Sequence, residues 1–401
     1  MRINRMLLPL LVMSLLAMSL LAGCATTVVR PAPRPDAPAP ATTGALAGNL
    51  GVLTAQRLPA DVDGYRPPLK LAVLLPLSGD MSRAALPVRD GLLAGYYAEN
   101  RRRPEITFHD TAAGVDAAYD QAVANGADFV VGPLGRAEVD ALYSRQSLPI
   151  PVLALNRGEL PPPPGNASFA LAPEDDGVAA AEYAISRGAR RVLSLADGDD
   201  SMRRAAAAFR ARFEELDGTV VVELVVNATP GAMGTALQTA ATTDGGIDAV
   251  FLAVRPSQAG AIVAQLADVG LGGKLRIGTS ALAGARPADT SGHALDGIAF
   301  PSDAWSVQYV AGLPSSVTAA SMLATARGSA QRLFAFGYDA WLLTAFLERL
   351  ATNPAASVAG ATGTLRIDAG GNVVRTPAWS SWNGSNALPL GNNPPPVDAG
   401  R

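Results

Sequence analysis

The sequence predicts an α/β protein with two lobes, each built on a parallel β-sheet with helices on both faces. Two observations predict it: short apolar runs alternate with amphipathic segments from residue 70 to residue 278, and a second cycle of this alternation begins near Pro173. Continuous apolar runs are typical of strands buried on both faces, and strands separated by helices pair in parallel. With 401 residues, 49% of them hydrophobic, the chain can fill two cores.

The first cycle opens with the apolar run Lys70–Leu75, which predicts a buried strand. Val88, Leu92 and Tyr96 share one face of the helix that follows, and Gly126 is a suitable residue to end the next helix. The elements expected in this cycle are, in order, strand 70–75, helix 87–100, strand 106–109, helix 115–125, strand 128–131, helix 136–146 and strand 151–155.

The second cycle has the same make-up as the first. Its expected elements are helix 174–186, strand 191–195, helix 201–216, strand 220–226, helix 233–242, strand 249–254, helix 257–269 and strand 275–278. The alternation then stops. A long apolar helix is expected over 331–350, followed by a hairpin over 363–375 whose turn is Gly370-Gly371-Asn372.

The N-terminus has the features of an export signal. Arg2 and Arg5 precede the apolar stretch Met6–Leu20, which is short for a spanning helix and typical of a signal peptide. The stretch ends in Leu21-Ala22-Gly23-Cys24, which looks like a lipobox, and Cys24 is the one cysteine of the chain. The alternative is an ordinary signal peptide with a chance cysteine. We expect Cys24 to be the lipid anchor, because several acyl chains on one residue give stable attachment to a membrane.

The residue after the cysteine bears on the target membrane. In the enterobacterial sorting rule an Asp at this position retains a lipoprotein at the inner membrane, and here the residue is Ala25. We therefore expect the protein at the periplasmic face of the outer membrane.

The composition of the next segment indicates a spacer. Residues 25–68 contain five prolines between 31 and 40 and show no helical or strand period. Such a segment of 44 residues reaches roughly 150 Å when extended and about 35–40 Å as a coil. The expected domains are a signal peptide 1–23, an anchored Pro-rich linker 24–68, a first lobe 69–172 completed by about 301–352, a second lobe 173–300 completed by about 353–391, and a flexible tail 392–401.

Composition and motifs argue against several function classes. The 35 acidic residues balance 32 basic ones, which argues against a nucleic-acid-binding module, and one Cys with two His excludes Cys₄ and Cys₂His₂ zinc sites. The sequence has no Gly-x-Ser-x-Gly elbow, no Ser-x-x-Lys and no Walker A loop. We expect no enzymatic activity, no metal and no cofactor. A carboxylate pair for glycan cleavage stays open, although nothing nominates one.

Three polar features that could suggest a metal or catalytic site are better explained by structural roles. The acidic run Asp197–Asp200 lacks the EF-hand spacing, so we expect a turn that leads into a helix, with Asp200 or Ser201 as its N-cap. His109 is expected at a strand end and His293 in a loop, and neither has a partner at ligand spacing.

The order of elements over residues 69–391 resembles the type I periplasmic binding proteins, in which two Rossmann-like lobes are joined by three crossovers around a cleft. Within that superfamily the chain is similar to the LppC/LpoA lipoproteins. The strings that carry the resemblance are the lipobox, Val131-Gly132-Pro133-Leu134, Pro151-Val152-Leu153-Ala154-Leu155-Asn156 and Leu171-Ala172-Pro173-Glu174-Asp175-Asp176. The resemblance implies an activator of a class A penicillin-binding protein, a peptidoglycan synthase. Enterobacterial members have a large helical domain before this module, where this chain has the Pro-rich linker.

The candidate cleft residues lie where strands end, because ligands of such sheets bind beyond the carboxyl ends of the strands. They are Ser78, Gly79, Pro133, Leu134, Asn156, Arg157, Asp197, Arg255 and Ser280. The resemblance implies that the Ser/Thr pair and the acidic group used by amino-acid-binding relatives are replaced here, so amino-acid binding is lost or changed. Arg157 and Arg255 are either anion receivers or ordinary surface or inter-lobe arginines. Whether the cleft binds a small-molecule ligand is left open.

Two functions follow as alternatives. The first is an outer-membrane lipoprotein that binds and activates a peptidoglycan synthase. The second is a periplasmic solute-binding lipoprotein of an ABC-type uptake or sensing system. An envelope hydrolase has no motif in its favour. For the first function we expect two lobes that are fixed or barely hinged.

Overall fold

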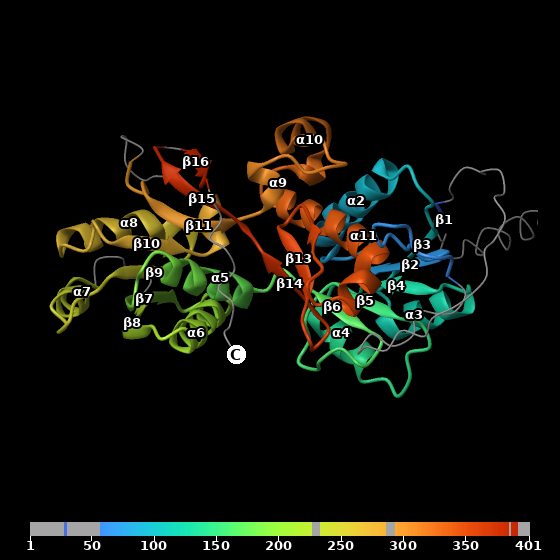
Figure 1. Ribbon diagram of the computed structural model, residues 1–401, viewed down its shortest axis with the longest axis horizontal. Coiled ribbons are helices and arrows are strands. Elements are labelled where there is room, and N and C mark those ends of the chain that lie inside the picture. The colour runs from blue at the N-terminus through green and yellow to red at the C-terminus, as the bar shows by residue number, and fades with distance from the viewer. Residues whose placement is uncertain (1–27, 30–56, 227–232, 286–292, 385, 392–401) are drawn as a thin grey trace, which may run out of the picture.

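The computed structural model describes residues 28–29, 57–226, 233–285, 293–384 and 386–391. The predicted signal peptide, the anchor Cys24, most of the predicted linker and the tail 392–401 lie outside these residues. The described chain forms two α/β lobes side by side, and segments of both its N-terminal and C-terminal parts contribute to the first lobe (Figure 1). The predicted fold class is confirmed.

The first lobe is built on a nine-stranded sheet of order β1-β3-β2-β4-β5-β6-β14-β13-β12. Strands β2 to β6 and β14 pair in parallel, while β1, β12 and β13 are antiparallel to their neighbours. The strands are β1 (Val28–Val29), β2 (Lys70–Leu75), β3 (Glu105–Asp110), β4 (Phe129–Val131), β5 (Val152–Ala154), β6 (Ala167–Phe169), β12 (Val358–Ala359), β13 (Thr364–Ile367) and β14 (Asn372–Thr376).

Two helices cover each face of this sheet. In the central strand β2, Leu71, Val73 and Leu75 pack with α2 (Ser82–Ala98) and α11 (Ala330–Thr352). Ala72 and Leu74 point the other way, into the core beneath α3 (Val115–Ala124) and α4 (Arg136–Tyr143). Because side chains alternate along a strand, the continuous apolar run at 71–75 serves both faces, as the sequence predicts.

The second lobe has a seven-stranded sheet of order β16-β15-β11-β10-β9-β7-β8. Helices α5 (Pro173–Ser186) and α6 (Asp200–Glu215) cover one face, and α7 (Gly234–Ala241) and α8 (Pro256–Asp268) cover the other. The strands are β7 (Arg191–Asp197), β8 (Thr219–Val226), β9 (Ala249–Ala253), β10 (Leu275–Gly278), β11 (Ile298–Ser302), β15 (Ala378–Asn383) and β16 (Asn386–Pro389).

A short helical excursion follows β11. It contains α9 (Ala304–Val307) and α10 (Ser316–Met322) and packs a small apolar cluster around Trp305 against Phe334 of α11. Figure 1 shows this excursion beside α2 and α11 of the first lobe. No helix of the described residues is both long and apolar enough to cross a bilayer.

Over the described residues the chain passes between the lobes three times, which is the number of crossovers that the resemblance implies. The passages follow β6, β11 and β14. The C-terminal assignment differs from the expected one. Residues 353–391 were expected to complete the second lobe, but β14 pairs in parallel with β6, so Val358–Thr376 complete the first sheet. Of the strands in this C-terminal range, only the antiparallel pair β15–β16 joins the second sheet, next to β11.

The end of the predicted linker also differs. Residues 57–68 pack on the first lobe rather than continuing the spacer. Tyr65 is fully buried, stacks edge-on against Phe346 and donates its hydroxyl to the carbonyl of Arg102. Arg66 pairs with Glu348 of α11 at 2.6 Å. The folded body therefore begins before residue 69.

Candidate inter-lobe site

A cluster of six charged side chains joins the two lobes. The first lobe supplies three arginines and the second lobe three aspartates, so the two sides are complementary in charge. The members are Arg157 after β5, Arg332 in the first turn of α11, Arg375 in β14, Asp175 and Asp176 in the first turn of α5, and Asp303 after β11.

Local structure explains why the aspartates lie here. Helix α5 begins with Pro173 as its first residue, which suits the fixed φ of proline, and Asp175 and Asp176 fall in its first turn. Carboxylates are stabilised at that end because the helix dipole is positive there. Helix α5 packs on α6 of the second lobe and also contacts β14 of the first, so its first turn lies at the junction.

Asp176 is the centre of the cluster. Its Oδ2 accepts hydrogen bonds from the Ser280 amide at 2.9 Å and from the Ser280 hydroxyl. Its Oδ1 lies 3.7 Å from Arg332 Nη2 and 3.9 Å from Arg375 Nη2. Arg332 also donates to the Ser280 hydroxyl. One carboxylate of the second lobe is thus held between two guanidinium groups of the first.

Asp303 completes the centre from the other side. Its Oδ1 lies 3.9 Å from Arg332 Nε and 3.9 Å from Arg375 Nη1. The Arg375 side chain is 2% exposed and also donates to the carbonyl of Thr362. Burial raises the pKa of Asp303, and the two facing arginines oppose that rise. The pairing keeps the buried charges compensated, which burial requires.

The pair Arg157–Asp175 also joins the two lobes, at a shorter distance than the contacts of Asp176 and Asp303. Arg157 Nη1 lies 2.7 Å from Asp175 Oδ1, and Arg157 Nη2 donates to the carbonyl of Val373 at 3.0 Å. Burial raises the pKa of Asp175, while Arg157 and Arg375 oppose the rise. Arg157 therefore bridges β14 and α5, which belong to different lobes.

The structure divides the predicted cleft residues into separate groups. Arg157 and Ser280 belong to the cluster just described. Asp197 and Arg255 form a separate pair within the second lobe, with Arg255 Nε 2.5 Å from Asp197 Oδ2. The reading of Arg157 as an inter-lobe arginine matches its contacts, and Arg255 pairs with its own lobe.

The remaining predicted residues belong to the first lobe. The Ser78 hydroxyl donates to Asp110 Oδ2 at 2.6 Å, and Gly79 occupies an exposed turn at φ 71°. Pro133 and Leu134 are buried, and Asn156 Nδ2 donates to the carbonyl of Leu134 at 2.9 Å. These contacts hold loops of the first lobe together.

Sequence reasoning assigned no site role to five of the six members of the cluster. Arg332, Arg375 and Asp303 are distant from one another in the sequence, and no local pattern marks them. Asp175 and Asp176 stood inside a string used for the resemblance, Leu171–Asp176, without being assigned a role. An acidic pair in the first turn of a helix that begins a new lobe was the available signal.

The acidic run Asp197–Asp200 and the two histidines have structural contacts. The N-cap of α6 is Asp199, whose Oδ1 accepts from the Ser201 amide at 2.9 Å, rather than Asp200 or Ser201. His109 lies buried in β3, and exposed His293 pairs with Asp296 at 2.7 Å. Among the described residues no group of three or more His, Cys, Asp or Glu side chains is placed to hold a metal ion.

Comparison with known proteins identifies the family. A family model described as "LppC putative lipoprotein" matches residues 64–384, which include both lobes. The chain belongs to the LppC family. Among curated relatives, a protein of Mannheimia succiniciproducens named "Penicillin-binding protein activator LpoA" is 28% identical over 336 residues, covering 80% of this chain and 55% of that protein. The chain thus spans about half the length of the curated relatives it matches.

Solved structures agree on the fold. The C-domain of LpoA from Haemophilus influenzae, described as a regulator of PBP1A, aligns with a TM-score of 0.70 at 24% identity, covering 80% of this chain and 99% of that domain. An ABC transporter substrate-binding protein from Sphaerobacter thermophilus aligns with a TM-score of 0.54 at 20% identity, covering 80% of this chain and 96% of that one. The chain thus shares its two-lobed fold with this LpoA domain and with this substrate-binding protein.

Proposed function

We propose that this LppC protein is an outer-membrane lipoprotein that binds and activates a class A penicillin-binding protein, a peptidoglycan synthase. The observation that carries the proposal is the match of both lobes, residues 64–384, to the LppC family, whose curated relatives are named as activators. In this proposal Cys24 is the lipid anchor and the two lobes are the part that meets the synthase. The Pro-rich linker, of which Val28–Val29 pair with β3 of the first lobe, joins the anchor to the folded body.

The inter-lobe cluster supports protein binding over solute binding. A solute-binding protein of this fold needs lobes that open and close around a ligand. Here Arg157, Arg332 and Arg375 are already paired with carboxylates of the other lobe. Opening of the lobes would leave these buried charges without their partners. We propose that the lobes form one fixed body that acts by contact, without catalysis.

The first test is retention of the partner. The full chain, attached to a resin through its C-terminus, is exposed to detergent-solubilised envelopes, and the retained proteins are identified. We expect a class A penicillin-binding protein to be retained and to be eluted by excess free chain. Retention of transporter subunits instead, with no synthase, would overturn the proposal in favour of the solute-binding alternative.

A further inference from the structure

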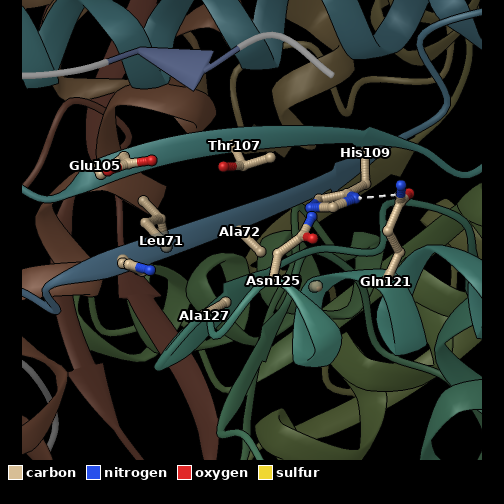
Figure 2. Close-up of a pocket in the computed structure, with 10 residues that line it drawn as sticks. Leu71, Ala72, Glu105, Thr107, His109, Gln121, Asn125 and Ala127 are labelled. Atoms are coloured by element: carbon tan, nitrogen blue, oxygen red, sulfur yellow. Dashed lines mark hydrogen bonds between the residues drawn. The ribbon is translucent and has the colours of Figure 1, made fainter. Parts of the chain in front are cut away.

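A short strand ties the beginning of the chain to the first lobe. Val28–Val29 form β1, which pairs antiparallel with β3 and is the last of the described strands on that side of the sheet. Val28 stands opposite Thr107, and Val29 stands opposite Ile106. Figure 2 shows β3 between β2 and this short strand, which lies beside the stretch that carries Thr107. The pairing thus falls inside the predicted Pro-rich linker, where the sequence shows no strand period.

The hydrogen bonds of β3 show which of its backbone groups face β1. The Glu105 amide donates to the carbonyl of Leu69, and the Thr111 amide donates to that of Leu75, so both point to the β2 side. Backbone groups of successive residues point to opposite edges of a strand. The N–H and C=O of Ile106 therefore point to the β1 side.

This alternation assigns different roles to the two residues of β1. Val29 and Ile106 are the pair that exchanges backbone hydrogen bonds, because the groups of Ile106 face β1. Val28 and Thr107 are the neighbouring pair without such bonds, and the N–H of Val28 points away from β3.

The pairing of β1 is weak enough to open. The inner edge of β3 pairs with β2 over six residues, whereas the outer edge pairs with β1 over two. Pairing of β1 also closes the loop formed by residues 30–56, which costs conformational entropy. One exchanged pair of backbone hydrogen bonds has to offset this cost. Both the paired and the released state are therefore accessible.

A second attachment of the chain does not depend on β1. Arg57 is 6% exposed, its Nε lies 3.8 Å from Asp128 Oδ2, and its guanidinium carbon lies 5.0 Å from the ring centroid of Phe129 at the start of β4. The folded body therefore keeps the chain from residue 57 onwards in either state of β1.

The two states differ in how far the body can move from the lipid. With β1 paired, Cys24 is four residues from the body, a distance of at most about 14 Å. With β1 released, Cys24 is 33 residues from Arg57, or about 110–120 Å when the chain is extended. Opening of β1 thus increases the reach about eightfold.

We infer that β1 is a reversible strap that sets the reach of the lipoprotein. When β1 is paired with β3, it holds the first lobe against the membrane that carries the Cys24 lipid. When β1 is released, the same body extends away from that membrane toward the synthase. The inference rests on the lipid anchor of the proposed function and deepens it, because contact with a distant synthase then requires the released state.

Hydrogen exchange of the full lipoprotein in detergent tests the pairing. Val29→Pro removes the N–H that donates to the Ile106 carbonyl, and should raise the exchange rate of the Ile106 amide about fivefold. Val28→Pro is the matched control, because proline is tolerated in an edge strand where its nitrogen faces away from the neighbouring strand. It should leave the exchange rate of the Ile106 amide unchanged.

A disulfide locks the strap in its paired state. Val28 and Thr107 form a pair without hydrogen bonds, whose Cα atoms lie about 4.5 Å apart, within the range that a disulfide spans. The two thiols of Val28→Cys/Thr107→Cys should therefore join on mild oxidation, while the sulfur of Cys24 is occupied by the lipid. The control is Val28→Cys/Asn125→Cys, whose second thiol is at an exposed site of α3 in the same lobe. It should oxidise about tenfold more slowly.

Neutron reflectometry of the lipoprotein on a supported bilayer measures the reach. The disulfide-locked chain should lie directly on the bilayer. Val29→Pro should be separated from it by a hydrated gap of about 30 Å, the coil dimension of 33 residues. Wild type should lie between these two, and reduction of the locked chain should restore the gap.

Several results would overturn the inference. Equal exchange at Ile106 in wild type and Val29→Pro, or equal oxidation of the two cysteine pairs, would show that β1 does not pair. A wild-type gap equal to that of Val29→Pro, or to that of the locked chain, would show a strap that is always open or always closed.

The outcomes also separate this inference from the proposed function. A chain that does not attach to the bilayer would refute the lipid anchor, and with it the role of the strap. Synthase retention is measured on solubilised envelopes, where the reach from a membrane has no effect. Retention together with an unpaired β1 would therefore remove the strap and leave the activator proposal in place.

Discussion

Arg375 and Asp339 show how single buried ionisable groups shape this protein. Arg375, in β14, faces two aspartates of the second lobe and is almost completely buried. Asp339, in the middle of α11, accepts hydrogen bonds from the amides of Ala361 and Thr362 and from the Thr362 hydroxyl. Neither contact is visible in the sequence, because each joins segments brought together only by the fold.

Replacement of Arg375 should be strongly destabilising. Arg375→Met leaves the carboxylates of Asp176 and Asp303 with less compensation in a buried place, and we expect a loss of about 3 kcal/mol in the free energy of unfolding. Urea unfolding followed by circular dichroism measures it. The control is Arg203→Met, which removes an exposed pair with Asp200 and should change stability by less than about 1 kcal/mol. Equal effects of the two substitutions would contradict the assignment.

Asp339 should give the stability a pH dependence. Burial raises the pKa of Asp339 from 3.8 to about 7, against the opposing hydrogen bonds of Thr362 and Ala361. Between these two values the folded state keeps a proton that the unfolded state releases. The stability from this group is therefore fully present below pH 3.8 and is lost as the pH rises to about 7.

The difference between wild type and Asp339→Asn isolates this effect. Other groups titrate in the same range, but they are common to both proteins and cancel. We expect the stability of wild type relative to the variant to fall between pH 4 and pH 7 in urea titrations. A difference that is constant, or that rises with pH, would show that the carboxyl is ionised throughout.

At the scale of elements, the crossing of α2 and α11 organises the first lobe. The helices approach so closely that a Cβ at Gly337 would lie 2.0 Å from the backbone oxygen of Val88, and one at Gly91 would lie 1.9 Å from that of Phe334. Glycine permits this contact because backbone meets backbone without a side chain between.

Substitution at the crossing should separate the helices. Gly337→Ala must push α2 and α11 apart, and we expect a loss of about 2–3 kcal/mol of unfolding free energy. Gly234→Ala in α7 is the matched control, since a Cβ there meets no atom within 4 Å. It should be neutral or stabilising by up to about 1 kcal/mol. Thermal unfolding of both variants gives the comparison, and a stable Gly337→Ala protein would contradict the close crossing.

The sequence predicts the elements whose patterns are long and local. The run at β2 and the periodic helix α6 lie close to their expected places. The three-residue strand β6 was missed, and the sheet assignment of β14 was wrong, because partners far apart in sequence decide both. Helix α2 begins at Ser82 rather than at 87, with Pro87 inside its first two turns.

The same difference between local patterns and distant partners decides which residues of the candidate site could be predicted. Strand-end residues such as Arg157 and Ser280 were predicted because the fold class places strand ends near a cleft. Their partners were not predicted, because Arg332 and Arg375 come from a helix and a hairpin that the second crossover, after β11, brings back to the first lobe and close to α5.

At the scale of the whole molecule, the charge-complementary junction predicts lobes that stay in place. Small-angle scattering of the full chain should give the same radius of gyration with and without millimolar leucine or another amino acid. Asp176→Arg, which sets a cation against Arg332 and Arg375, should open the lobes and enlarge the radius. Compaction of wild type on addition of an amino acid would indicate a solute-binding hinge.

The most direct test of the proposed function is the rate of glycan polymerisation by a purified class A penicillin-binding protein, with and without the full lipoprotein, in detergent or vesicles. The proposal predicts a faster rate that saturates as the lipoprotein is added and does not depend on amino acids. An unchanged rate, together with no binding of the synthase at micromolar concentrations, would contradict it.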